Sequence, residues 1–267
     1  MQYEDRALPL TRGQLDIWLA QETGQSGTEW QLGLSVRIEG PVDRDALERT
    51  IRQTVAEAEP GRVSFFEVDG GVVQRAFDYP DLELAFYDLS GSGDPVQEAR
   101  EIAASIQRTP MPLDGQLFKF VLFQTRLDEF YLFGCCHHIA IDGLGMALVA
   151  RRIATIYSAM VSGEPIPPAF FGSLQDLVDC ELEYEASTDY LEDQDYWSRN
   201  LPSESGPHYR SPQAAGERDP HSPSPPVQLD PSVAGGIKQL SKALGIRRFS
   251  VITAACALLV RGWSDNA

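Results

Sequence analysis

The sequence of 267 residues predicts an α/β fold, a two-layer sandwich of a mixed sheet and helices. Strand-like segments, in which apolar residues alternate, are interleaved with helix-like segments, in which apolar residues recur every three or four positions. The clearest strand pair is a hairpin of residues 117–125 and 129–137, and a helix follows it at 143–162. Strands interleaved with helices are typical of an α/β layered domain. The hydrophobic content of 43% is enough to bury a sizeable core.

The apolar spacing predicts seven elements before the hairpin, in chain order: a helix ending at Glu22 after a loop at Leu8, a strand at 30–39, a helix at 42–58, strands at 63–68, 71–77 and 82–88, and a helix at 95–107. Thr11 and Asp43 are the expected N-caps of the first two helices. Leu32, Leu34, Val36 and Ile38 share one face of the first strand. Asp69 and Gly70 are a tight-turn signal between the next two strands.

The second half of the chain changes character after residue 170. An acidic, aromatic-spotted helical stretch at 173–197 is followed by a Pro/Ser/Gly-rich linker at 201–226, which we expect to be an exposed loop. A short strand at 227–230 and helices at 232–244 and 249–263 finish the chain.

These patterns predict three parts: a lobe at 1–172, a helical connection with a flexible linker at 173–226, and the start of a second lobe at 227–267. A strand and two helices are too few for an independent core of the usual size, so we expect the chain to stop early in its second lobe.

Charge and cysteine content exclude several classes of function. The chain has 22 Lys+Arg against 39 Asp+Glu, and this excess of acid argues against a nucleic-acid partner. The four cysteines show no CxxC spacing, so neither a zinc site nor a disulfide framework is expected, and the adjacent Cys135 and Cys136 are expected to be core residues. The sequence contains no signal peptide and no apolar run near the length of a membrane helix, which favours the cytoplasm.

The candidate for chemistry is His137-His138-Ile139-Ala140-Ile141-Asp142-Gly143, in which a strand runs into paired histidines and then into a helix. Neighbouring side chains of a strand point to opposite faces, so the two histidines have different roles: one projects into a cavity while the other packs. Imidazole is suited to proton transfer near neutral pH. Gly143 permits a tight turn and leaves its backbone open, and Asp142 can hold a cation or the loop.

HHxxxDG is the signature of the condensation-domain superfamily, which the chain resembles over nearly its whole length. Residues 8–18 resemble the opening helix motif of that family, with its Gln and Trp, and residues 196–202 resemble the segment leaving its first lobe. Residues 58–65 occupy the place of its second motif, of which only Arg62 and Phe65 survive. The resemblance implies a fold like chloramphenicol acetyltransferase, with two similar lobes and an active site in a tunnel between them.

Two departures from the family pattern stand out. The family usually has a serine two residues after the motif, whereas this sequence has Leu144-Gly145. The basic residue that pairs with the motif aspartate in the family is expected beyond Ala267. Asp142 must then find a local donor or face solvent, and Arg62 is the candidate partner.

The resemblance implies the condensation domain of a nonribosomal peptide synthetase, which forms an amide between a donor acyl thioester and an acceptor aminoacyl thioester. His138 would be the base or hydrogen-bonding orienter, His137 and Asp142 would hold the loop, and Gly143 would allow close substrate approach. No cofactor is bound directly, because substrates arrive on the 4′-phosphopantetheine of donor and acceptor carrier proteins. A downstream adenylation domain is a further expected partner, and a membrane is not.

Four alternatives stay open. Epimerisation domains keep HHxxxDG but normally follow a carrier domain, whereas Met1 lies just before the first motif here. Heterocyclisation domains usually carry aspartates in place of the histidine pair. A carrier-independent acyltransferase and a catalytically silent carrier-docking or scaffold lobe are the other two, and the fragment alone is expected to be inactive.

Overall fold

The computed structural model describes residues 7–23, 27–77, 82–201 and 229–263. The chain divides into two compact units, 1–192 and 193–267, each described here by itself. The predicted linker at 201–226 lies outside the described residues apart from Leu201. The three-part division of the chain stays a prediction.

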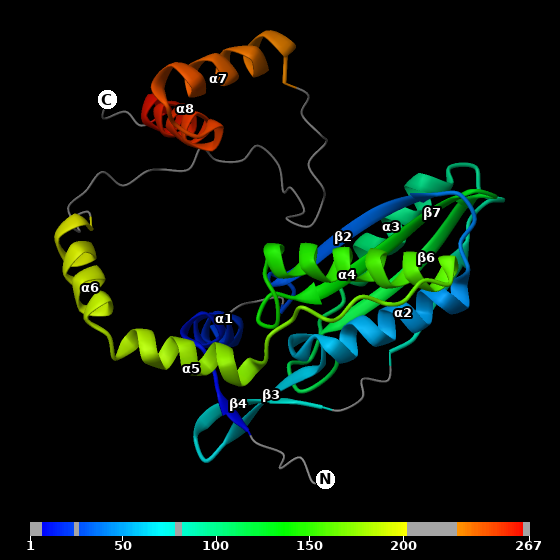
Figure 1. Ribbon diagram of the computed structural model, residues 1–267, viewed down its shortest axis with the longest axis horizontal. Helices are drawn as coiled ribbons and strands as arrows, with labels where there is room; N and C mark the ends of the chain where they lie inside the picture. The colour runs from blue at the N-terminus through cyan, green and yellow to red at the C-terminus, as the bar shows by residue number, and fades with distance from the viewer. Residues whose placement is uncertain (1–6, 24–26, 78–81, 202–228, 264–267) are drawn as a thin grey trace. The chain divides into compact units, whose positions relative to one another are not determined.

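Two sheets form the frame of the first unit (Figure 1). The larger has the order β2-β7-β6-β5 and consists of β2 (Gln31–Glu39), β5 (Leu84–Asp88), β6 (Phe118–Arg126) and β7 (Glu129–His137). β5 runs parallel to β6, and the other two pairings are antiparallel. The smaller sheet has the order β1-β4-β3 and consists of β1 (Leu8–Pro9), β3 (Val63–Val68) and β4 (Gly71–Ala76). The predicted α/β class with a mixed sheet and the hairpin at its centre are confirmed.

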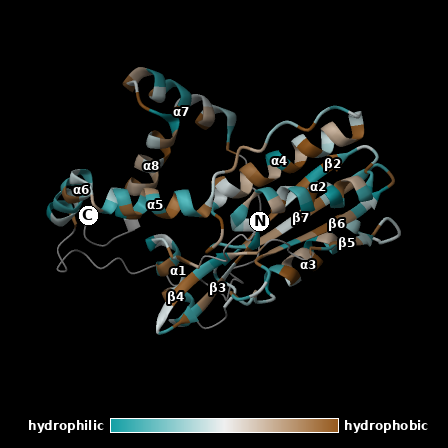
Figure 2. Cartoon of the chain, turned by 60° about the horizontal axis from the view of Figure 1, so that its bottom comes forward, coloured by the Kyte–Doolittle hydropathy of each residue, from teal (hydrophilic) through white to brown (hydrophobic). Residues whose placement is uncertain are grey.

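Helices cover both faces of the larger sheet, because its central strands β6 and β7 bury side chains on both faces. α2 (Arg44–Glu57) and α4 (Gly143–Ser162) pack against each other on one face, and α3 (Pro95–Gln107) lies on the other (Figure 1). The pleat explains why the helices lie on different faces. A Cβ on Gly33 would point to the α3 face, 2.7 Å from the Gln107 side chain, whereas a Cβ on Gly134 would face Met146 of α4. In Figure 2, α2 alternates hydrophilic and hydrophobic residues, as expected of a helix that buries one side.

α4 is long and apolar enough to span a membrane by length and composition alone. Its apolar side packs in the protein core, however, since Met146, Val149, Ile153 and Ile156 are all buried. α4 therefore has the burial of a core helix.

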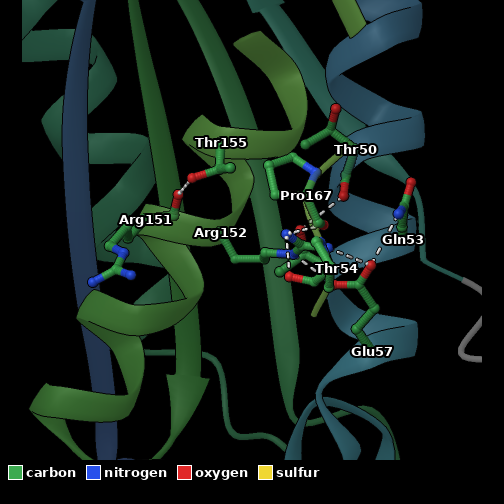
Figure 3. Close-up of polar contacts among 9 residues, drawn as sticks. Thr50, Gln53, Thr54, Glu57, Arg151, Arg152, Thr155 and Pro167 are labelled. Atoms are coloured by element: carbon green, nitrogen blue, oxygen red, sulfur yellow. Dashed lines mark hydrogen bonds and ion pairs between the residues drawn. The ribbon is translucent and has the colours of Figure 1, made fainter. Parts of the chain in front are cut away.

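An ion pair inside the first unit joins α4 to α2 (Figure 3). The Arg152 side chain is 2% exposed and donates to both carboxylate oxygens of Glu57, at 2.6 and 2.8 Å. It also donates to the Pro167 and Pro168 carbonyls at 2.9 and 3.3 Å. Burial raises the pKa of Glu57, but hydrogen bonds from Arg152 and Gln53 outweigh it, so the pKa is lowered overall.

The helical stretch predicted at 173–197 is two helices, α5 (Leu174–Glu185) and α6 (Thr188–Asn200). The break lies at Ser187, whose hydroxyl donates to the Tyr184 carbonyl at 2.6 Å and accepts from the Tyr190 amide at 3.2 Å. Serine side chains compete with the helix backbone in this way, so one residue ends a helix and begins the next.

The second unit contains α7 (Pro231–Leu244) and α8 (Arg248–Trp263), bent by 110° at their junction. Of the strand predicted at 227–230, only Leu229 and Asp230 are described. That prediction is wrong for these two residues, because Asp230 caps α7 through the Ser232 amide instead.

Candidate functional site

The HHxxxDG segment lies where β7 ends and α4 begins. The His138 amide donates to the carbonyl of Trp30, the residue before β2, at 2.7 Å. This hydrogen bond continues the pairing of β7 with β2 by one residue. The Ala140 amide then donates to the His137 carbonyl at 3.1 Å and closes a turn. This geometry places the two histidines on opposite sides of the strand end, as the pleat requires.

His137 is fully buried, and its ring nitrogens have different partners. Nδ1 accepts from the Ile139 amide at 3.2 Å, so the proton of the neutral ring must lie on Nε2. Nε2–H therefore donates to Gln21 Oε1 at 2.6 Å. Burial, with a smaller contribution from His138, lowers the pKa of His137 to about 4. His137 is thus neutral at physiological pH and occupied at both nitrogens, as a packing residue should be.

His138 is half-buried and lies on the other side of the strand end. Its ring meets the Trp30 ring edge-on, with centroids 6.2 Å apart. Its imidazole makes no hydrogen bond with any residue that the structure describes, so both nitrogens can serve a bound substrate. The assignment of His138 as the reacting histidine stays a prediction, and this geometry agrees with it.

Asp142 is the N-cap of α4. Its carboxylate accepts from the Gly145 amide at 2.7 Å, and its carbonyl accepts from the Met146 amide at 2.9 Å. Asp142 therefore finds the local donor that the sequence required, and that donor is a backbone amide. This cap fixes where α4 starts relative to the histidines.

Arg62 is not the partner of Asp142. Its guanidinium donates to the Phe77 carbonyl at 2.6 Å and to the Ala56 carbonyl at 3.3 Å, and it lies 3.9 Å from the Glu59 carboxylate. Arg62 supports the junction between α2 and the small sheet instead. The pairing failed as a prediction because the sequence alone does not report which loop a guanidinium reaches.

Gly143 and Leu144 open the first turn of α4 toward solvent. A Cβ on Gly143 would meet nothing within 4 Å, and Leu144 is 70% exposed. Gly143 is not among the residues with positive φ, so the turn does not require glycine, and this part of the expectation is wrong. The expected open backbone at Gly143 agrees with the structure.

An apolar cavity of about 200 Å³ lies between α4 and the β2–β7 part of the sheet. Its walls include the β2 face predicted from alternation (Leu34, Val36, Ile38) and, from β7 and α4, Leu132, Gly134, Met146, Val149 and Ile153. A Cβ on Gly134 would stand 3.1 Å from Met146 Cε, so glycine lets the methionine lie against the strand at this point. The cavity begins one turn into α4 from the motif.

Cys135 and Cys136 are buried core residues, as predicted. Burial raises the pKa of Cys135 to about 11 and that of Cys136 to about 12. Both thiols are therefore protonated near neutral pH and are not nucleophiles. Among the described residues, no cluster of His, Cys, Asp or Glu could hold a metal ion.

Sequence reasoning gave no role at the site to three glutamines that surround the motif: Gln14, noted only as part of the opening helix motif, Gln21, which is also in α1 (Arg12–Thr23), and Gln74 of β4. The available signal was the spacing of Gln14, Trp18 and Gln21, which places all three on one face of a helix.

Comparison with known proteins gives a consistent result. The family model of the condensation domain matches residues 4–267. A dimodular nonribosomal peptide synthase of Bacillus subtilis is 32% identical over 195 residues, which cover 73% of this chain and 8% of that protein. An isonitrile lipopeptide synthase of Streptomyces coeruleorubidus is 31% identical over 197 residues, covering 71% of this chain and 13% of that protein.

Two solved structures are similar in fold. The first condensation domain of the calcium-dependent antibiotic synthetase, in complex with a substrate analogue, has a TM-score of 0.82 at 30% identity, covering 96% of this chain and 61% of that one. The starter condensation domain of rhizomide synthetase has a TM-score of 0.69 at 29% identity, covering 74% and 48%. The chain thus spans less than two thirds of the length of each relative named here.

Proposed function

Because this chain belongs to the condensation-domain family of nonribosomal peptide synthetases, we propose that the protein forms an amide bond between two carrier-tethered acyl groups. The acceptor amine attacks the carbonyl carbon of the donor thioester. A C–N bond forms, the C–S bond breaks, and the donor carrier thiol leaves with the proton that the amine gives up. No covalent enzyme intermediate is needed.

The observation that supports this reaction best is the difference in burial and hydrogen bonding between the two histidines. His137 is buried, neutral and hydrogen-bonded at both nitrogens, whereas His138 is half-buried and its imidazole has no hydrogen-bond partner among the described residues. In the proposal His138 accepts or orients the proton of the attacking amine. One general base contributes about 10²- to 10⁴-fold, while aligning two reactants contributes roughly 7–11 kcal/mol, so positioning dominates.

The proposed substrates arrive on the 4′-phosphopantetheine arms of a donor and an acceptor carrier protein, and no cofactor is bound directly. Open space around Gly143 supports close approach of such an arm to the first turn of α4. An adenylation domain acting downstream and a cytoplasmic location belong to the same proposal.

The apolar cavity supports an aliphatic group as part of the donor. Its walls are almost wholly apolar, and its volume of about 200 Å³ suits a short hydrocarbon chain better than a charged side chain. A mutant of the similar starter condensation domain has been solved in complex with C8-CoA, which is in keeping with an acyl chain here.

The test is amide formation by the whole native protein with a donor acyl group and an acceptor aminoacyl group loaded on separate carriers. A new amide on the acceptor carrier, seen by mass spectrometry of the intact carrier, is the expected product. Inversion of the acceptor Cα without amide formation would identify an epimerisation domain. Carrier binding without any reaction would identify a scaffold lobe.

A further inference from the structure

Both backbone polar groups of Ile139, the residue after His138, are held by side chains. The Ile139 amide donates to His137 Nδ1 at 3.2 Å, and the Ile139 carbonyl accepts from Gln14 Nε2 at 3.3 Å. The amide belongs to the same peptide group as the His138 carbonyl, and the His138 amide is held by Trp30. The backbone of His138 is therefore fixed on both sides, and only rotation within its side chain is left.

The two hydrogen bonds of the Ile139 backbone both depend on residues of α1. Gln14 contacts the carbonyl directly, and Gln21 Oε1 accepts from His137 Nε2, which fixes the tautomer whose Nδ1 accepts from Ile139. Gln14 and Gln21 are seven residues apart, with buried Trp18 between them, so they lie on one helix face two turns apart. One rigid helix thus carries both contacts.

Gln14 is itself locked by a buried partner. Gln14 Nε2 donates to Gln74 Oε1 at 2.9 Å, and Gln74 Nε2 donates back to Gln14 Oε1 at 2.8 Å. The remaining groups are satisfied as well, since Gln74 also donates to the Pro9 carbonyl and Gln14 Oε1 also accepts from the Thr11 amide. This buried pair leaves the Gln14 amide one orientation, in which its second N–H reaches Ile139.

We infer that α1 is the positioning element of the reaction: Gln14 and Gln21 hold Ile139 from both sides and thereby aim His138. The inference rests on the proposed function, in which His138 meets the reacting amine. Gln14 and Gln21 are positioning residues, because the hydrogen-bond partners of their side chains among the described residues are Thr11, Gln74, Ile139 and His137, and not His138.

Charged groups near this arrangement are few. Within the described part of the chain, His138 is the one titratable side chain that acts on the pKa of His137. On the α1 side, Glu22, Glu67 and Asp114 line a surface pocket together with Gln21. Burial keeps His137 neutral, and Gln21 is the side chain through which a charge can be placed against Nε2.

The test is Gln21→Glu in the whole native protein, a change of the same size that places a carboxylate on His137 Nε2. A carboxylate favours the imidazolium and raises the pKa of His137. Once protonated, Nδ1 becomes a donor and can no longer accept from the Ile139 amide. Gln97→Glu on the exposed side of α3 is the matched control.

For Gln21→Glu we expect kcat and hydrogen exchange of the 137–142 amides near those of the native protein at about pH 8.5. As the pH falls to about 6, kcat should drop by about tenfold or more and exchange of these amides should rise, while the native protein and Gln97→Glu change neither in that way. Gln21→Glu matching the control at both pH values would overturn the inference.

A double variant, Gln14→Leu with Gln74→Leu, removes the carbonyl contact without leaving either buried glutamine amide unpaired. The Thr11 amide and the Pro9 carbonyl also lose a partner, but Thr11 is half-buried and Pro9 is exposed. Lower kcat with an unchanged KM and a normal melting temperature is expected; unchanged kcat would contradict the inference. If the native protein makes no amide, the proposed function fails, and the exchange measurement still decides whether α1 holds the loop.

Discussion

Gly145 and Ile141 lie so close that a Cβ on Gly145 would stand 2.5 Å from Ile141 Cγ1. Ile141 thus occupies the space that a side chain at position 145 would need, which is a physical reason why this chain has glycine where the family usually has serine. Cγ1 can move away only if the stiff χ1 angle of this β-branched side chain changes, so the two positions are coupled.

We expect Gly145→Ser to lower the free energy of unfolding by about 1–3 kcal/mol, because it overpacks this turn. In an Ile141→Ala background the same change should cost clearly less, since Cγ1 and Cδ1 are gone. Denaturant melts of the four proteins give the coupling energy as a double-mutant cycle. Equal costs in both backgrounds would show that the contact does not matter.

His138→Ala should lower amide formation by about 10²-fold or more and leave the fold intact. The half-buried ring makes no hydrogen bond with any described residue, so its loss should change the melting temperature little. The measurement is the rate of product formation with carrier-loaded substrates at saturating concentration. An unchanged rate would remove His138 from the mechanism.

Asp142→Ala should lower the free energy of unfolding by about 0.5–2 kcal/mol, because the Gly145 amide loses its cap. Asp142→Asn is the matched variant: asparagine caps a helix nearly as well, so it should cost much less. Calorimetric melting of both variants distinguishes a cap from a charge partner. A larger loss for asparagine than for alanine would contradict the capping role.

His137 should make stability depend on pH. Its folded-state pKa of about 4 lies below the ordinary value of 6.5, so the unfolded state binds the proton more readily. The contribution is complete above about pH 6.5 and is lost as the pH falls toward 4, by roughly 3 kcal/mol at most. Urea melts at several pH values in that window should show this slope, and His137→Gln should reduce it. Equal slopes for the two proteins would show that His137 is not the group responsible.

Arg152→Met should lower the free energy of unfolding by about 3–5 kcal/mol, because it leaves the Glu57 carboxylate without its cation. Adding Glu57→Gln should recover part of the loss, since a neutral amide tolerates the site better. Arg151→Met, next to it but exposed, is the control and should be nearly neutral. A similar loss for both single variants would contradict the role assigned to the ion pair.

The sequence by itself determined the elements that hold the site. The hairpin pattern at 117–125 and 129–137 predicted β7 to the residue, and the apolar spacing after Gly143 predicted the full extent of α4. Alternation also separated His137 from His138, because the side to which a strand residue points depends only on its position along the pleat. These are local properties of the chain, and the HHxxxDG pattern indicated the condensation-domain family.

Only the tertiary structure decided which distant residues meet. Gln14, Gln74 and Ile139 are far apart in the chain, and the sequence contains no periodicity that links a helix, a strand and a loop through buried amides. The same holds for Arg62, the candidate partner of Asp142, which reaches the Phe77 carbonyl instead. A hydrogen bond forms with whichever partner the packed elements bring within about 3 Å. The apolar periodicity of a single helix or strand does not determine how the elements pack together.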